Sequence, residues 1–124
     1  MSIEYVMDYE DDRWEVENAK EAALDEIKMG IAVRGSLEEL RKMPLGGGMN
    51  EPVSPLVHAR NQVERSLVYA RHGLPLWIGT EPMMSATAPA TVAGTVVLWN
   101  AESLSCLVIG QMAASPEHRP PIVY

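Results

Sequence analysis

The sequence contains no phenylalanine, a single cysteine, and fewer basic than acidic residues. The one cysteine, Cys106, excludes a disulfide within the chain, and a reducing cytoplasm is the expected location. Its apolar neighbours Leu104, Leu107 and Val108 favour a buried apolar role over that of a nucleophile. Lysine and arginine number 10 against 17 acidic residues, for a net charge of −7. Nucleic acid is therefore not an expected partner, because binding it requires a basic surface.

A basic leader sequence is also missing. Residues 1–26 contain ten acidic residues against Arg13 and Lys20, so we expect no secretion signal. We treat residues 1–18 as an acidic leading segment, which is either a solvated face or, as the less favoured alternative, a docking surface for a basic partner. Residues 19–124 are then the folded segment, within a composition that suits one domain at most.

Motifs for metal and phosphate binding are lacking as well. His58, His72 and His118 have no metal-ligand spacing with one another or with Cys106, and we expect His58 on the solvated face of a helix. The run Gly46-Gly47-Gly48 is not followed by the Gly-Lys-Ser/Thr of a phosphate loop. We expect these glycines to form a flexible or closely packed backbone instead.

Apolar periodicity and turn residues predict helices that alternate with short strands. Ser36 and Glu39 have the spacing of a capping box, and Ser54-Pro55 pairs a cap residue with a proline, as does Thr87 with Pro89. The expected helices run from Trp14 to Val33, with Gly35 as the stop, from Ser36 to Lys42, from Ser54 to His72, and from Thr87 to Ala114 with a break near Asn100. The expected strands run from Leu45 to Asn50, from Leu76 to Gly79, and from Ile122 to Tyr124.

This alternation predicts an α/β fold. Helical connections of this length suit parallel crossovers, and uniformly apolar strands suit a parallel sheet covered on both faces. The run from Ala86 to Ala101 is rich in small apolar residues, with Asn100 and Glu102 interrupting it. A membrane span is the less favoured interpretation of this run, and a helix buried within a larger protein is the preferred one. The final Ile-Val-Tyr starts a strand with no turn after it, which suggests an excerpt of a longer polypeptide.

Candidate binding residues follow the predicted strands. In parallel α/β sheets, the loops after the carboxyl ends of the strands form the site. Asn50 and Glu51 follow one strand, and Glu81, Met83 and Met84 follow the next. Glu81 is able to supply charge or accept a proton, and methionines form an adaptable apolar lining. The alternative is that Glu81 is a structural carboxylate bonded to a neighbouring loop.

Three stretches of the chain resemble one protein family. They are NEPVSPL (50–56), GLPLWIGTEPMMSATAPATVAGTVVLWNAESL (73–104) and PPIVY (120–124). These stretches are similar to the trimethylamine:corrinoid methyltransferase family, which includes relatives that act on glycine betaine and similar quaternary amines. The Thr-Ala-Pro helix start and the Asn-Ala-Glu centre at 100–102 are the more specific elements. The resemblance covers about residues 19–124.

The resemblance implies a (β/α)8 TIM barrel, of which this chain is a partial section of about three strand–helix units. It also implies transfer of a methyl group from a methylated or quaternary amine to the cobalt of a corrinoid, a cobalamin-type cofactor that a partner protein carries. This chain is not expected to bind the corrinoid tightly. Carboxylates and aromatic faces attract a cationic methylammonium group. The expected substrate-binding residues are therefore Asn50, Glu51, Glu81, Met83, Met84 and Tyr124, with no metal ligand and no catalytic residue assigned.

Two features depart from the family pattern. The three glycines occupy a strand position that is usually apolar, and Glu51 is inserted within the Asn-Pro pair. The full-length protein is expected to be an enzyme, with a homo-oligomer as an open option, whereas the chain alone is expected to be inactive. The alternative is a non-catalytic truncated or interaction protein with no activity of its own.

Overall fold

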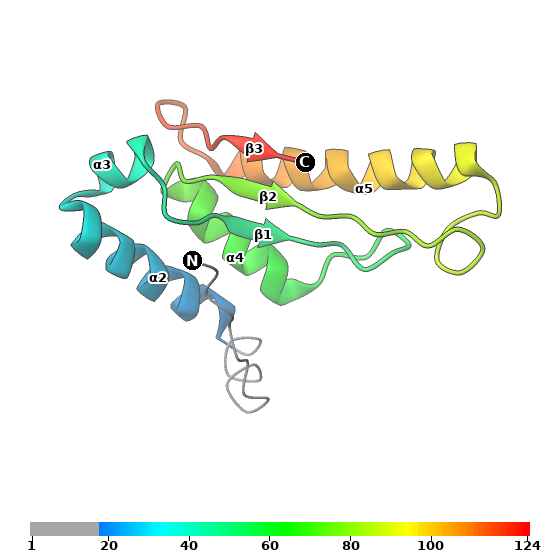
Figure 1. Ribbon diagram of the computed structural model, residues 1–124, viewed down its shortest axis with the longest axis horizontal. Coiled ribbons are helices and arrows are strands. Elements are labelled where there is room, and N and C mark those ends of the chain that lie inside the picture. The colour runs from blue at the N-terminus through cyan, green and yellow to red at the C-terminus, as the bar shows by residue number, and fades with distance from the viewer. Residues whose placement is uncertain (1–17) are drawn as a thin grey trace, which may run out of the picture.

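The computed structural model describes residues 18–124, which form helices around a small parallel sheet (Figure 1). The helices are α2 (Ala19–Arg34), α3 (Leu37–Lys42), α4 (Arg60–Arg71) and α5 (Val92–Ala113). The strands are β1 (Gly48–Asn50), β2 (Leu76–Ile78) and β3 (Ile122–Val123), each shorter than the sequence predicts. Residues 1–17, and with them most of the acidic leading segment and the start of the first predicted helix, lie outside the described part.

The sheet is parallel throughout, and its strand order β1-β2-β3 follows the sequence. This confirms the predicted α/β arrangement of three parallel strands. One row of paired residues, Gly48, Leu76 and Ile122, points toward the helices, since Gly48 lies against Tyr69 of α4 and Leu76 against Gly110 of α5. Both helices therefore cover the same face of the sheet.

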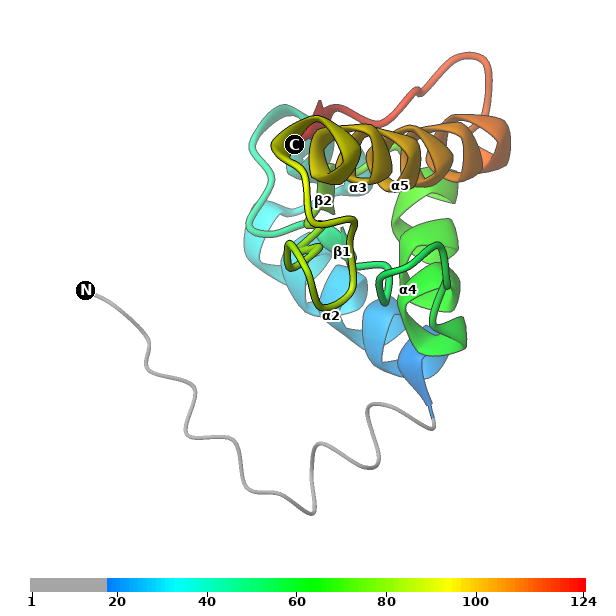
Figure 2. The ribbon, with the colours of Figure 1, turned by 90° about the vertical axis from the view of Figure 1, so that its right-hand side faces the viewer.

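The other face of the sheet is bare in the described part of the chain. The neighbouring row consists of Met49, Trp77 and Val123, whose exposed fractions are 38%, 49% and 57%. The prediction of a sheet covered on both faces is therefore wrong for these residues, because each crossover returns its helix to the same side. Figure 2 shows α2, α4 and α5 grouped around β1 and β2.

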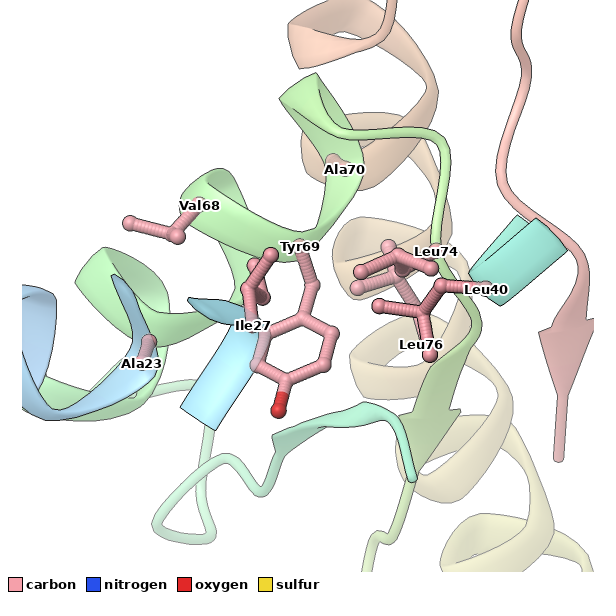
Figure 3. Close-up of a cluster of buried hydrophobic side chains, with 8 residues drawn as sticks. All are labelled: Ala23, Ile27, Leu40, Val68, Tyr69, Ala70, Leu74 and Leu76. Carbon is pink, nitrogen blue, oxygen red and sulfur yellow. The ribbon is translucent and has the colours of Figure 1, made fainter. Parts of the chain in front are cut away.

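The core lies where α2, α3 and α4 meet β2. It is a cluster of apolar side chains that are at most 5% exposed: Ala23, Ile27, Leu40, Val68, Tyr69, Ala70, Leu74 and Leu76 (Figure 3). α2 supplies Ala23 and Ile27 at a spacing of four, and the end of α4 supplies three consecutive residues, Val68, Tyr69 and Ala70. The core thus packs against the amino-terminal ends of β1 and β2, and the loops that follow their carboxyl ends lie outside it.

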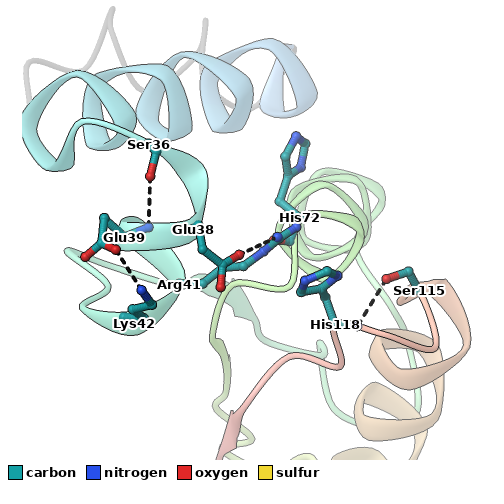
Figure 4. Close-up of polar contacts among 8 residues, drawn as sticks. All are labelled: Ser36, Glu38, Glu39, Arg41, Lys42, His72, Ser115 and His118. Carbon is teal, nitrogen blue, oxygen red and sulfur yellow. Dashed lines mark hydrogen bonds and ion pairs between the residues drawn. The ribbon is translucent and has the colours of Figure 1, made fainter.

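Local signals set the ends of the first two helices as predicted. Gly35 ends α2 in the left-handed conformation with φ 89°, and the Ser36 hydroxyl accepts a 3.1 Å bond from the Glu39 amide at the start of α3. The Glu39 carboxylate binds Lys42 at 2.7 Å (Figure 4). Arg41 of α3 donates to the His72 carbonyl at 2.8 Å, which joins α3 to the end of α4.

Two predicted helix starts are wrong. α4 begins at Arg60 and not at Ser54, because residues 53–57 form a turn in which Val53 and Val57 exchange backbone hydrogen bonds of 2.7 and 3.0 Å. α5 begins at Val92, where the Thr91 hydroxyl accepts from the Gly94 amide, and not at Thr87. The predicted break near Asn100 is absent, since α5 runs unbroken to Ala113.

Among the described residues, α5 is long and apolar enough to cross a membrane, with a mean hydropathy of 1.6 over its most apolar window. Its one charged residue, Glu102, is only 1% exposed, and the helix packs on α4 and β2. Gly110 permits the close approach to Leu76. These contacts lie along one side of α5, and 17% of its most apolar window is buried among the described residues. A helix covered by further parts of a larger protein is the interpretation we prefer.

Candidate functional site

The candidate site lies at the carboxyl ends of the parallel strands. Glu51 directly follows β1, Glu81 follows β2 after Gly79 and Thr80, and Tyr124 directly follows β3. The Gly79 amide donates to the Asn50 carbonyl at 3.2 Å. The segments that continue β1 and β2 therefore remain side by side just beyond the two strands. The two loops that carry Glu51 and Glu81 therefore start next to each other.

Glu51 and Glu81 line one open hollow of about 310 Å³. We call it the acidic hollow; its lining is Glu51, Pro52, Val53, Ala59, Asn61, Gln62 and Glu81. The Glu51 side chain crosses above Gly79, where a Cβ atom would lie 3.1 Å from Glu51 Oε1. No basic side chain is among these lining residues, so two carboxylates set the charge of the hollow and favour a cation there.

The other predicted binding residues do not line the acidic hollow. Met83 and Met84 are 61% and 51% exposed in the loop beyond Glu81, and Tyr124 is 76% exposed at the end of β3. Asn50 is buried, and its side-chain amide makes no hydrogen bond within residues 18–124. The structure thus brings Glu51 and Glu81 together. A part for any of these residues in substrate binding stays a prediction.

The two loops are built alike. Each begins with Glu-Pro, and each contains a turn closed by a β-bridge, between Val53 and Val57 in the first loop and between Met84 and Ala88 in the second. Between them and α5 lies a second, more open hollow of about 540 Å³. We call it the apolar hollow; its lining is Pro55, Leu56, Ala86, Thr87, Ala88, Pro89, Gly94, Val97, Leu98 and Ala101.

The centre of α5 is bonded to both loops. Glu102 accepts hydrogen bonds from the Ser54 hydroxyl and the Leu56 amide, each at 2.9 Å. The Ser103 hydroxyl lies 3.2 Å from that of Thr80, the residue before Glu81. The sequence interpretation missed this role: it noted Glu102 as an interruption of the apolar run and as part of the Asn-Ala-Glu family element, without assigning it a contact. The available signal was a single charge inside a helix that is otherwise uncharged.

His58 is also placed by α5. Its Nε2 atom lies 2.9 Å from the Ser105 hydroxyl, and its Nδ1 atom is buried with no hydrogen-bond partner within residues 18–124. The prediction that His58 lies on a solvated helix face is wrong, because His58 precedes α4 and the turn at 53–57 directs it toward α5.

Cys106 lies one turn beyond Glu102 and is 1% exposed, which confirms the predicted burial. Burial raises the pKa of its thiol to about 11, so the thiolate that a nucleophile needs is scarce at neutral pH. Among residues 18–124, no three His, Cys, Asp or Glu side chains are grouped closely enough to bind a metal ion.

Comparison with known proteins identifies the family. The profile of the trimethylamine methyltransferase family matches residues 8–122, which is nearly the whole chain. The chain belongs to this family. The resemblance inferred from the NEPVSPL, Thr-Ala-Pro and Asn-Ala-Glu stretches is thereby confirmed.

Individual relatives in the trimethylamine methyltransferase family match over part of their length. A trimethylamine methyltransferase of Desulfitobacterium hafniense is 35% identical over 88 residues, which are 71% of this chain and 18% of that protein. One from Methanosarcina barkeri is 36% identical over 78 residues, or 63% of this chain and 16% of that protein. A glycine betaine methyltransferase of D. hafniense is 27% identical over 105 residues, or 85% and 21%. The chain thus spans about a fifth or less of these relatives.

Proposed function

We propose that this chain is one section of a methyltransferase that takes a methyl group from a methylated or quaternary amine, of the trimethylamine or glycine betaine type. The section corresponds to about three strand–helix units of a (β/α)8 barrel. Family membership supports this proposal, as do three parallel strands in sequential order with helices on one face only. In a closed barrel, the bare row Met49, Trp77 and Val123 would face the interior.

The observation that carries the proposal is the pair of carboxylates in the acidic hollow. Glu51 and Glu81 come from successive strand ends, the position that carries the site in barrel enzymes. A quaternary ammonium group donates no hydrogen bond, so charge and shape must bind it. Two carboxylates in one hollow attract a cation without needing a hydrogen bond from it. Glu51 and Glu81 would bind and orient the amine.

The family resemblance implies a corrinoid, carried by a partner protein, as the methyl acceptor. The residues suited to contact it are those of the apolar hollow, such as Pro55, Leu56 and Val97, because this hollow is open and adjoins both loops. When bound, the corrinoid supplies a cobalt atom that receives the methyl group. The residues of this chain would orient the amine and exclude water from it. For the full-length protein we further propose a cytoplasmic location, with a homo-oligomer as an open option.

A hybrid enzyme tests the proposal. The glycine betaine methyltransferase of D. hafniense aligns with 85% of this chain and can serve as the host. Its aligned section is replaced by residues 19–124, and methyl transfer from glycine betaine or trimethylamine to cobalamin is followed by absorbance. We expect a folded, active hybrid. A hybrid that melts cooperatively but transfers no methyl group from either amine would refute the proposal.

Variants of the hybrid test the carboxylates. Glu81→Gln keeps the shape and removes the charge, so we expect the KM for the amine to rise about tenfold, corresponding to about 1.4 kcal/mol of lost attraction. Glu117→Gln is the matched control, because Glu117 is exposed in the turn after α5, at the other end of the sheet. Equal KM values for Glu81→Gln and Glu117→Gln would exclude Glu81 from the site.

The second candidate function is a non-catalytic interaction protein. The observation in its favour is the buried core that α2, α3, α4 and β2 form among the described residues. Size-exclusion chromatography of the 124-residue chain distinguishes the two. A monomer supports the independent module, and a folded chain that self-associates through the bare row Met49, Trp77 and Val123 supports the barrel section.

A further inference from the structure

Consecutive residues of α5 bind the two loops of the acidic hollow. Glu102 is 1% exposed, and both of its carboxylate oxygens are used: Oε2 accepts from Ser54 Oγ and Oε1 from Leu56 N. Both donors belong to the loop that begins at Glu51. Ser103, 7% exposed, pairs with Thr80 immediately before Glu81. One turn of one helix is therefore bonded to the start of each acidic loop.

Glu102 is a costly residue to bury for stability alone. A carboxylate loses favourable hydration when it leaves water, and within residues 18–124 no basic side chain is bonded to it. An apolar side chain of similar volume would fill the position at lower cost. What a carboxylate adds is two charge-assisted hydrogen bonds with defined directions, which orient the 53–57 turn against α5.

α5 is a suitable reference for both loops. It is a continuous helix of 22 residues, and it packs on the sheet through the close contact of Gly110 with Leu76. A loop that is hydrogen-bonded to α5 is held at a fixed place relative to the sheet, because α5 itself is fixed on the sheet. Binding sites need this kind of support, because misplacement of a binding group by about 1 Å reduces its effect.

We infer that Glu102 and Ser103 are positioning residues, which set the separation of the Glu51 and Glu81 carboxylates by binding their two loops to one turn of α5. The inference deepens the proposed function and rests on it only for its effect on amine binding. The positioning of the loops is a property of this chain alone and can be measured separately.

The first experiment measures positioning in the 124-residue chain by residue-resolved hydrogen exchange. In Glu102→Leu the Leu56 amide loses its acceptor, so we expect its exchange to accelerate about 10- to 100-fold relative to core amides such as that of Leu76. Glu102→Gln retains an acceptor oxygen, and the Ser54 hydroxyl can rotate to accept from the new amide. Its acceleration should stay below about threefold.

Cys106→Ala is the matched control for this experiment. Cys106 is as buried as Glu102 and lies one turn away, but within residues 18–124 its side chain makes no hydrogen bond to either loop. We expect Cys106→Ala to accelerate all amides that exchange by global unfolding and to leave the ratio of Leu56 to Leu76 unchanged. An unchanged ratio in Glu102→Leu as well would overturn the positioning role.

The second experiment measures amine binding in the hybrid enzyme. We expect Glu102→Leu to raise the KM for the amine about tenfold with little change in kcat. Glu102→Gln should raise KM less than threefold. Cys106→Ala should lower the Tm without changing KM. Adding Glu51→Gln to Glu102→Leu should raise KM no further than the larger single effect, because both act through the same carboxylate. Additive effects, or an effect of Glu102→Leu on Tm alone, would overturn the inference. An inactive unsubstituted hybrid refutes the proposed function, and the exchange ratio then decides the positioning role.

Discussion

The three glycines before β1 have unequal roles, and single alanine substitutions should separate them. A Cβ atom at Gly46 would meet no atom within 4 Å. At Gly47 it would lie 2.8 Å from the Pro75 carbonyl oxygen, and at Gly48 it would lie 2.9 Å from the Cβ atom of Tyr69. Both neighbours are attached closely to backbone, so neither can move aside as a long side chain would. The run is close-packed at two positions and open at one.

The magnitudes follow from these contacts. Inserting a methyl group into a packed site costs about 1–3 kcal/mol, so Gly47→Ala and Gly48→Ala should each lower the free energy of unfolding by about 2 kcal/mol. Gly46→Ala should instead raise it by about 0.5 kcal/mol, because alanine reduces the conformational freedom of the unfolded chain. With a urea m-value of about 2 kcal/mol/M, the first two midpoints fall by about 1 M and the third rises slightly.

The assay is urea unfolding of the 124-residue chain, followed by circular dichroism and by tryptophan fluorescence, to which Trp77 beside Gly47 contributes. Gly46→Ala serves as the internal control for loss of backbone flexibility. If all three variants shift the midpoint equally, close packing is not the reason for the glycines, and the approach of α4 to β1 described above is wrong.

Three further predictions concern the core and α5. Gly110→Ala should lower the free energy of unfolding, measured in urea, by about 1 kcal/mol, because the new contact with buried Leu76 outweighs the gain in helix propensity. Leu76→Val should lower the free energy of unfolding less in the Gly110→Ala variant than in the unsubstituted chain. Tyr69→Phe should lower it by about 2 kcal/mol, because the hydroxyl loses its 2.6 Å bond to the Glu26 carboxylate; an unchanged midpoint would show that bond to be dispensable. Burial raises the pKa of the Cys106 thiol to about 11, whereas the thiol of the unfolded chain ionises from about pH 8.5. The free energy of unfolding should therefore fall as the pH rises from about 8.5 to about 11. The fall should be shallower in Cys106→Ala, and equal slopes in the two proteins would contradict burial of the thiol.

Local signals predicted the parts of the fold that local interactions determine. Gly35 ends a helix by its own conformation, and Ser36 caps the next helix through a residue three positions away. Ser54 carries the same kind of signal as Ser36, yet it caps nothing. Its hydroxyl binds Glu102, 48 residues further along the chain, and no local rule anticipates such a partner.

The candidate site was predictable to the extent that it follows from strand direction. Parallel strands place their carboxyl ends together, which brings Glu51 and Glu81 into one hollow. The loop beyond Glu81 is longer and turns back through its own bridge, so Met84 is directed by that turn and not by β2. The contacts of Glu102 were not predicted, because they depend on loops that only the folded chain brings near it.

The agreement between sequence order and strand order in the sheet has a consequence for synthesis. As the chain leaves the ribosome, β1 has already been made when β2 emerges and can pair with it, and β2 has been made when β3 emerges. No strand has to insert between two earlier ones, and no segment has to pass through a closed loop. Each helix is likewise released before the strand that follows it, so it can cover its part of the sheet while the next strand is still being made. The chain can therefore assemble by stepwise addition at one growing edge, at the pace of translation.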